Sequence, residues 1–204
     1  MGKKVILFDL GDVVEWHQYQ GLYRYIAQQC NCSPVRAEEI FLEKVRLTDT
    51  RALAVTRLIP TIEKELACSL NKREFVKRLY NGVKEDHPVF SLLKELRKDY
   101  TLVLFSNLNE QHAKWSIKKW NLKRYFGHLF FSYQYKTRKP EVKFYKIVLK
   151  KLQINPEECI MIDDKEQNLK PARKLGMKTI LFKGNVKEVK KKIEMRQPGF
   201  EPGS

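Results

Sequence analysis

The 204-residue sequence contains no apolar run that approaches the roughly 20 residues needed to span a membrane. Its four cysteines form no CxxC pair and follow no metal-ligand spacing, so we expect ordinary reduced thiols. The N-terminal segment lacks the long apolar core of a signal peptide. These absences predict a cytoplasmic globular protein that does not contact a membrane.

Acidic residues are scarce relative to basic ones, with 24 Asp and Glu against 40 Lys and Arg and a net charge of +16. Such a charge attracts anionic substrates and also permits nucleic-acid binding. However, the lysines are spread over the whole chain, and the densest run is short, from Lys187 to Lys192. Composition therefore leaves nucleic-acid binding open without favouring it, and it does not indicate an oligomeric state.

The first buried segment is an apolar run from Val5 to Phe8, which leads directly into Asp9. A continuous apolar run of this kind predicts a buried strand of a parallel sheet. Asp9 then lies at the carboxyl end of the strand, where open α/β sheets bind their ligands. An aspartate at this point can also be the N-cap of a helix, so the later strands must decide between the two interpretations.

Glycine is rare between residues 18 and 86, where only Gly21 precedes Gly82, and helical spacing recurs. Ser33-Pro34 predicts a helix start, Ala52 to Leu66 a further helix, and Asn71 the N-cap of a helix that reaches Leu79. No strand pattern is evident in this block. We therefore predict an all-helical cap over residues 16–87, inserted after the first strand.

The remainder of the chain alternates between strands and helices. Four further strands are predicted, at Thr101–Phe105, His128–Phe131, Cys159–Ile162 and Thr179–Phe182. Such alternation predicts an α/β fold with a doubly wound, Rossmann-like parallel sheet of about five strands. Residues 1–15 and 88–196 would form this core, and the Pro/Gly-rich residues 197–204 a loose tail.

Polar side chains follow the predicted strands at their carboxyl ends. Asp9, Ser106 and the pair Asp163-Asp164 occupy such positions, and Lys139 precedes a helix. Because parallel strands end at one edge of the sheet, these groups can converge. Three carboxylates in one small site require a cation, and an oxygen-rich site suits Mg²⁺. A hydroxyl and a lysine beside them could hold a phosphoryl group.

Four motifs occur in order as Phe8-Asp9-Leu10-Gly11, Leu104-Phe105-Ser106-Asn107, Arg138-Lys139-Pro140 and Ile162-Asp163-Asp164 with Asn168. In these four stretches, the chain resembles the haloacid dehalogenase superfamily of hydrolases. The resemblance covers nearly the whole chain, because the helical insert also stands where that superfamily carries a cap. It is closest to the branch that includes sugar-phosphate phosphatases.

The resemblance implies a phosphatase mechanism in which Asp9 is the nucleophile and forms an aspartyl-phosphate. Ser106 would hydrogen-bond the phosphoryl oxygens and Asn107 would help to position them. Lys139 would balance the charge of Asp9 and of the phosphate. The implied substrate is a small phosphorylated metabolite, such as a sugar phosphate.

The resemblance also implies a Mg²⁺ site. Asp9 and Asp163 would coordinate the ion directly, and Gly11 would offer its backbone carbonyl. Asp164 would lie in or near the second coordination shell. The metal ligands are thus predicted from the first and fourth motifs.

One position departs from the family pattern. The common phosphatases carry an acid two residues after the nucleophile, whereas this chain has Gly11 there and an acid one residue later, Asp12. Asp12 is the candidate acid and base, or else a structural residue. The alternatives are a metal-independent 2-haloacid dehalogenase, whose members also lack this acid, and a non-catalytic module of the same fold that binds phosphate, RNA or protein.

Overall fold

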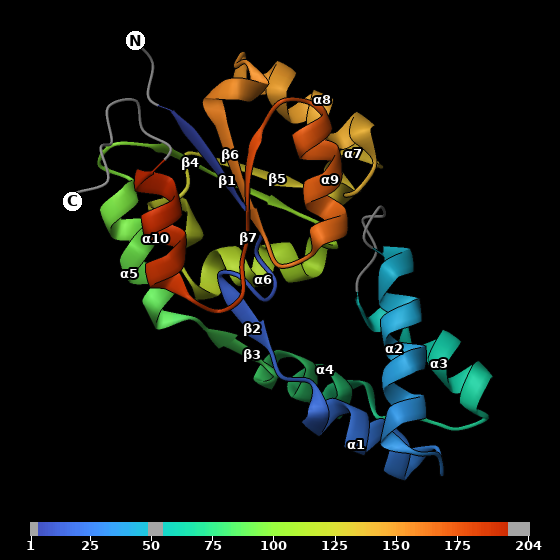
Figure 1. Ribbon diagram of the computed structural model, residues 1–204. Coiled ribbons are helices and arrows are strands. Elements are labelled where there is room, and N and C mark those ends of the chain that lie inside the picture. Colours follow the sequence, from blue (N-terminus) through green and yellow to red (C-terminus); the bar gives the residue numbers. More distant parts are fainter. Residues whose placement is uncertain (1–3, 49–54, 196–204) are drawn as a thin grey trace.

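The computed structural model describes residues 4–48 and 55–195 of the chain. Its centre is a five-stranded parallel sheet with the strand order β5-β4-β1-β6-β7 (Figure 1). This sheet confirms the predicted doubly wound α/β fold. The strands are β1 (Val5–Phe8), β4 (Thr101–Ser106), β5 (His128–Phe131), β6 (Cys159–Asp163) and β7 (Lys178–Leu181).

Helices cover both faces of the sheet. They are α5 (His87–Leu96), α6 (Glu110–Lys119), α7 (Ser132–Tyr135), α8 (Val142–Leu152), α9 (Glu166–Lys174) and α10 (Val186–Glu194). Side chains of β1 alternate between the faces, as a strand requires. Ile6 and Phe8 pack with residues of α5, α6 and α10, whereas Val5 and Leu7 pack with residues of α8 and α9. The central strand is therefore buried on both sides, which explains its unbroken apolar sequence.

The helical insert follows β1 and has an apolar cluster of its own, to which its four helices contribute. These are α1 (Gln20–Gln29), α2 (Pro34–Thr48), α3 (Ile59–Leu66) and α4 (Lys72–Asn81). In Figure 1 the insert lies to one side of the sheet, beyond the carboxyl end of β1. The boundaries of a separate cap at residues 16–87 remain a proposal.

A two-stranded antiparallel ribbon joins the insert to the core. It consists of β2 (Glu15–His17) and β3 (Val83–Glu85), with Trp16 opposite Lys84. The expectation that this block contains no strand is therefore wrong at its two ends. Strands of three residues are too short to show an alternating pattern, which is why the sequence did not predict them.

The predicted helix starts are confirmed at two positions. The Ser33 hydroxyl accepts from the Arg36 N–H before α2, and the Asn71 side chain accepts from the Glu74 N–H before α4. The third helix is shorter than predicted. It begins at Ile59, after a 3₁₀ turn at Val55–Arg57. The predicted residues 52–54 and the predicted tail 197–204 lie outside the described residues.

The prediction of four reduced cysteines is wrong for two of them. Cys30, at the end of α1, and Cys68, after α3, form a disulfide within the insert. Cys32 and Cys159 are free. The pairing could not be predicted from spacing alone, because the two residues stand 38 positions apart and meet only when the insert folds.

Across residues 4–48 and 55–195, every helix is too short or too polar to cross a membrane.

Candidate active site

A cavity of about 580 Å³ lies between the carboxyl edge of the sheet and the helical insert. Residues that follow β1 and β4 line one side of it, together with residues at the start of α9. The insert supplies aromatic and aliphatic side chains to the other side. The predicted site residues that line the cavity are Asp9, Gly11, Asp12, Ser106, Asn107 and Lys139.

The register of the sheet brings Asp9 and Asp163 together. Phe8 pairs with Ile162, so the next residue of each strand is an aspartate at the same level. The Asp9 N–H donates to the carbonyl of Ile162 over 2.9 Å, which extends the pairing by one residue. Two buried carboxylates thus face the same space at the edge of the sheet.

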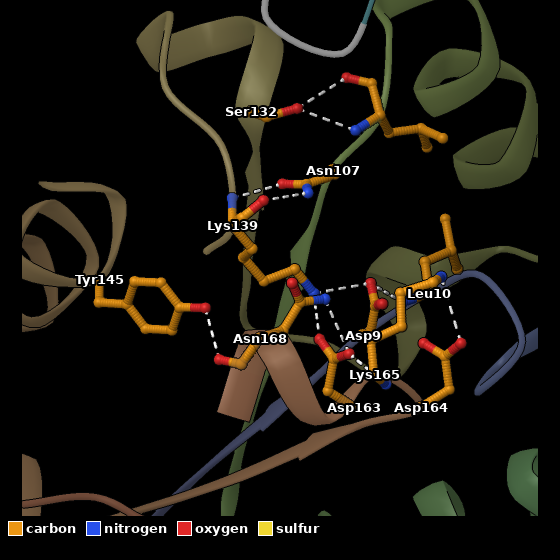
Figure 2. A network of polar contacts seen from close by, with 11 residues as sticks. Asp9, Leu10, Asn107, Ser132, Lys139, Tyr145, Asp163, Asp164, Lys165 and Asn168 are labelled. Atoms are coloured by element: carbon orange, nitrogen blue, oxygen red, sulfur yellow. Dashed lines mark hydrogen bonds and ion pairs between the residues drawn. The ribbon is translucent and has the colours of Figure 1, made fainter. Parts of the chain in front are cut away.

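Lys139 places its ammonium between these two carboxylates, as Figure 2 shows. Its Nζ lies 3.0 Å from Asp9 Oδ1 and 2.6 Å from Asp163 Oδ2. Burial opposes the charge of Lys139, but Asp163 and Asp9 outweigh it and raise the pKa of the lysine above its ordinary value. The lysine therefore stays charged and holds the two acids together.

The two acids differ in their pKa. Burial would raise the pKa of Asp9, but Lys139, Lys165 and a hydrogen bond with Ser106 together lower it. Burial raises the pKa of Asp163 to about 6, with Asp9 adding to the effect and Lys139 opposing it. Asp9 is consequently the acid that ionises more readily, which suits a nucleophile.

Two hydrogen bonds to one carboxylate oxygen fix the side chain of Asp163. Its Oδ1 accepts from the Asn168 amide and from the Lys165 N–H, each over 2.9 Å. Asn168 is fixed in turn because its carbonyl accepts from the Tyr145 hydroxyl over 2.6 Å (Figure 2). The sequence did not point to Tyr145 or Lys165, although a lysine directly after two aspartates was a visible signal.

The side chains of Asp9, Asp163 and Asp164 form a group that could hold a metal ion, because each offers an oxygen and these oxygens lie within 4.8 Å of one another. Asp164 Oδ1 is buried and has no hydrogen-bond partner. An orphaned carboxylate oxygen beside two further carboxylates fits a divalent cation with oxygen ligands, such as Mg²⁺.

Asn107 holds the backbone of Lys139 through both ends of its side-chain amide. Its Nδ2 donates to the Lys139 carbonyl and its Oδ1 accepts from the Lys139 N–H, both over 2.8 Å. The second N–H of Nδ2 takes part in neither bond, so it could donate to a phosphoryl oxygen while both bonds stay in place. The predicted phosphate-binding role of Asn107 stays a prediction.

The loop after Asp9 brings Asp12 and His17 together. Asp12 has a left-handed backbone, with φ of 58°, and its Oδ1 accepts from the His17 N–H over 3.0 Å. A Cβ atom added at Gly11 would lie only 2.6 Å from Cε1 of His17. The imidazole of His17 thus fills the space beside Gly11 in which the family's usual second acid would begin.

Comparison with known proteins places these features in a family. The sequence model of haloacid dehalogenase-like hydrolases matches residues 6–182. The chain is 45% identical over 62 residues to bifunctional epoxide hydrolase 2 of Rattus norvegicus, which covers 30% of this chain and 11% of that protein. It is 26% identical over 106 residues to a phosphorylated carbohydrates phosphatase of Thermotoga maritima, which covers 51% of this chain and 49% of that protein. The chain thus spans half or less of the length of these relatives.

Among solved structures, a HAD family enzyme of Bacteroides thetaiotaomicron is similar over most of its length. Its complex with magnesium and inorganic phosphate superimposes with a TM-score of 0.73 at 27% sequence identity. The match covers 90% of this chain and 96% of that enzyme.

Proposed function

Because the chain belongs to the family of haloacid dehalogenase-like hydrolases, we propose that it is a Mg²⁺-dependent phosphatase of small phosphomonoesters. One observation carries this proposal: oxygens of Asp9, Asp163 and Asp164 lie within 4.8 Å of one another, and Asp164 Oδ1 is buried without a partner. A dehalogenase would need no cation at this point. The relative from Bacteroides thetaiotaomicron, which was crystallised with magnesium and phosphate, supports the same assignment.

In the proposed reaction an oxygen of Asp9 attacks the phosphorus, and the bond to the leaving oxygen breaks. The phosphoryl group is then carried as an aspartyl-phosphate, which water hydrolyses in a second step. Ser106 and Lys139 line the cavity beside Asp9, so they would orient and neutralise the phosphoryl oxygens. Bound Mg²⁺ would offset the charge of the carboxylates and of the phosphoryl group, held by Asp9, Asp163, Asp164 and the Gly11 carbonyl.

Protonation of the leaving oxygen is the weak step of this scheme. Asp12 engages one carboxylate oxygen with the His17 N–H, which favours a role in shaping the loop. We therefore expect esters with good leaving groups, such as aryl phosphates, to react faster than alkyl phosphates, since general acid catalysis typically contributes about 10²–10⁴-fold. Asp12→Asn should alter this ratio only if Asp12 is the acid.

The cavity and the relatives support a small phosphorylated substrate. Arg46 and Arg138 line the cavity and would attract an anion. The relative from Thermotoga maritima is named for phosphorylated carbohydrates, which makes a sugar phosphate one candidate. The insert supplies the wall opposite Asp9, so we expect substitutions there to change substrate preference more than activity toward a small aryl phosphate.

The test is hydrolysis of an aryl phosphate with Mg²⁺ and with chelator, in the wild type and in three variants. Asp9→Asn should keep the fold but abolish turnover, and Asp163→Asn should abolish the response to Mg²⁺. Asp99→Asn, at an exposed position after α5, is the matched control and should leave activity unchanged. Full activity in chelator would contradict the metal assignment. Release of halide from a 2-haloacid would then establish the dehalogenase alternative.

A further inference from the structure

A second polar cluster lies beside the cavity, centred on Glu15. This carboxylate is fully buried at the start of β2. Its Oε2 accepts from the Ser116 hydroxyl over 2.9 Å and from Trp120 Nε1 over 2.8 Å. Its Oε1 instead faces two imidazoles, with Nε2 of His112 at 3.0 Å and Nε2 of His17 at 3.3 Å.

Two buried polar atoms near this carboxylate have no hydrogen-bond partner. One is His112 Nε2, which is close to Glu15 Oε1 but does not have the geometry of a hydrogen bond. The other is the hydroxyl of Tyr80, whose ring packs edge-on against His112 with centroids 5.9 Å apart. Burial, with the charge of Glu15 adding to it, raises the pKa of Tyr80 to about 12. Orphaned buried groups of this kind indicate a bound ion or water.

We propose that Glu15 Oε1, His17 Nε2 and His112 Nε2 bind a transition-metal ion such as Zn²⁺. Two imidazoles and one carboxylate are a ligand set that Zn²⁺ uses in proteins, with a fourth position left open. A tetrahedron with ligands at about 2.0–2.1 Å separates them by about 3.3 Å. The separations from Glu15 Oε1 are close to this value, and the three ligand atoms lie within 4.8 Å of one another.

The surrounding residues would hold these ligands in place. Ser116 and Trp120 orient the carboxylate through its other oxygen. Asp12 Oδ2 lies 3.8 Å from His17 Nδ1, where a small shift would form the carboxylate–histidine pair that often accompanies a metal-bound imidazole. The ring of His17 also stacks on Tyr19, with centroids 5.1 Å apart and an angle of 15°.

This site is distinct from the proposed Mg²⁺ site. Asp9, Asp163 and Asp164 offer only oxygen, which suits Mg²⁺, whereas imidazole nitrogens favour Zn²⁺ and similar metals. His17 and His112 both line the cavity, so the open position would face it. Because His17 lies on β2 and His112 on α6, a bound ion would also tie the base of the insert to the core.

The experiment uses the untagged 204-residue chain, freed of metal and then saturated with Mg²⁺. Titration with Co²⁺ should give the visible absorption of a tetrahedral site at one equivalent, and Zn²⁺ should displace it. His112→Gln and His17→Gln should each abolish this signal. Ser116→Ala, which removes only a supporting hydrogen bond, should weaken Zn²⁺ binding about 10–100-fold.

Two control variants distinguish metal binding at Glu15, His17 and His112 from binding at another histidine or at the proposed Mg²⁺ site. His128→Gln changes an exposed histidine on β5 and should bind Co²⁺ like the wild type. Asp163→Asn should lose the response to Mg²⁺ but keep the Co²⁺ signal. If the wild type shows no tetrahedral absorption and no Zn²⁺-dependent rise in its melting temperature, the cluster is a hydrogen-bonded network only, and the proposal is overturned. A Co²⁺ signal that persists in both His112→Gln and His17→Gln would overturn it equally. None of these readouts depends on phosphatase activity.

Discussion

Replacing Lys139 with methionine should destabilise the protein and abolish its activity. The ammonium is the group that separates the buried carboxylates of Asp9 and Asp163, at 3.0 and 2.6 Å. Methionine keeps much of the length of the side chain but removes the charge. The two acids would then face each other without their shared cation.

The expected loss of stability in Lys139→Met depends on the burial of the lysine side chain. The Lys139 side chain is 0% exposed, and removing one partner of a buried ion pair costs about 3–5 kcal/mol. Burial already raises the pKa of Asp163 to about 6, with Asp9 adding to the shift, so Asp163 can take up a proton and relieve part of the repulsion. We therefore expect a loss of about 3 kcal/mol in the free energy of unfolding near neutral pH. Added Mg²⁺ should recover part of it, because a bound cation offsets the same charges.

Denaturant unfolding with and without Mg²⁺ measures this loss. Lys165→Met is the matched control: its side chain is 51% exposed and its ion pair with Asp164 lies near the surface, so we expect a change below about 1 kcal/mol. In Lys139→Met, the further substitution Asp163→Asn should restore stability by about 0.5–3 kcal/mol, since it removes one of the two repelling acids. If Lys139→Met is as stable as the wild type without Mg²⁺, the argument from the buried cation is wrong.

Three further predictions concern the insert and its base. Burial would raise the pKa of Glu15, but His112 and His17 lower it below its ordinary value of 4.5. It therefore contributes stability above pH 4.5 that is lost as the pH falls, and Glu15→Gln should reduce this loss in acid unfolding curves. Gly11→Ala places a Cβ atom 2.6 Å from His17 Cε1, so it should cost about 1–3 kcal/mol through overpacking. His17→Ala in the same chain should recover stability; no recovery in denaturant titrations would contradict the predicted clash. In denaturant without reductant, Cys32 and Cys159 should react with a thiol reagent, and a count of four reactive thiols would disprove the disulfide.

The sequence predicted the sheet and much of the site because both depend on local patterns. Apolar runs that end in Asp9, Ser106 and Asp163 identify buried parallel strands, and parallel strands place their carboxyl ends at one edge. Asp9 and Asp163 then lie side by side because β1 pairs with β6.

The Glu15 cluster could not be predicted in this way. Its members come from β2 and α6, and Glu15 and His112 meet only through the packing of these two elements. A single acid between Val14 and Trp16 was the one local signal, because a carboxylate in an apolar stretch is costly to bury without partners. The packing of β2 against α6 determines which partners Glu15 has, and the order of residues along the chain does not reveal this packing.

The ribbon of β2 and β3 brings the two ends of the insert together. His17 pairs with Val83, so the two points where the chain enters and leaves the insert lie side by side. A two-residue turn is enough to join antiparallel strands at such a point, and the insert has an apolar cluster of its own. The pairing of β1 with β4 and β6, which sets Asp9 beside Asp163, therefore does not depend on the length of the chain between His17 and Val83. The side of the cavity that the insert lines can thus vary in length and sequence while the strand ends that carry Asp9 and Asp163 stay paired.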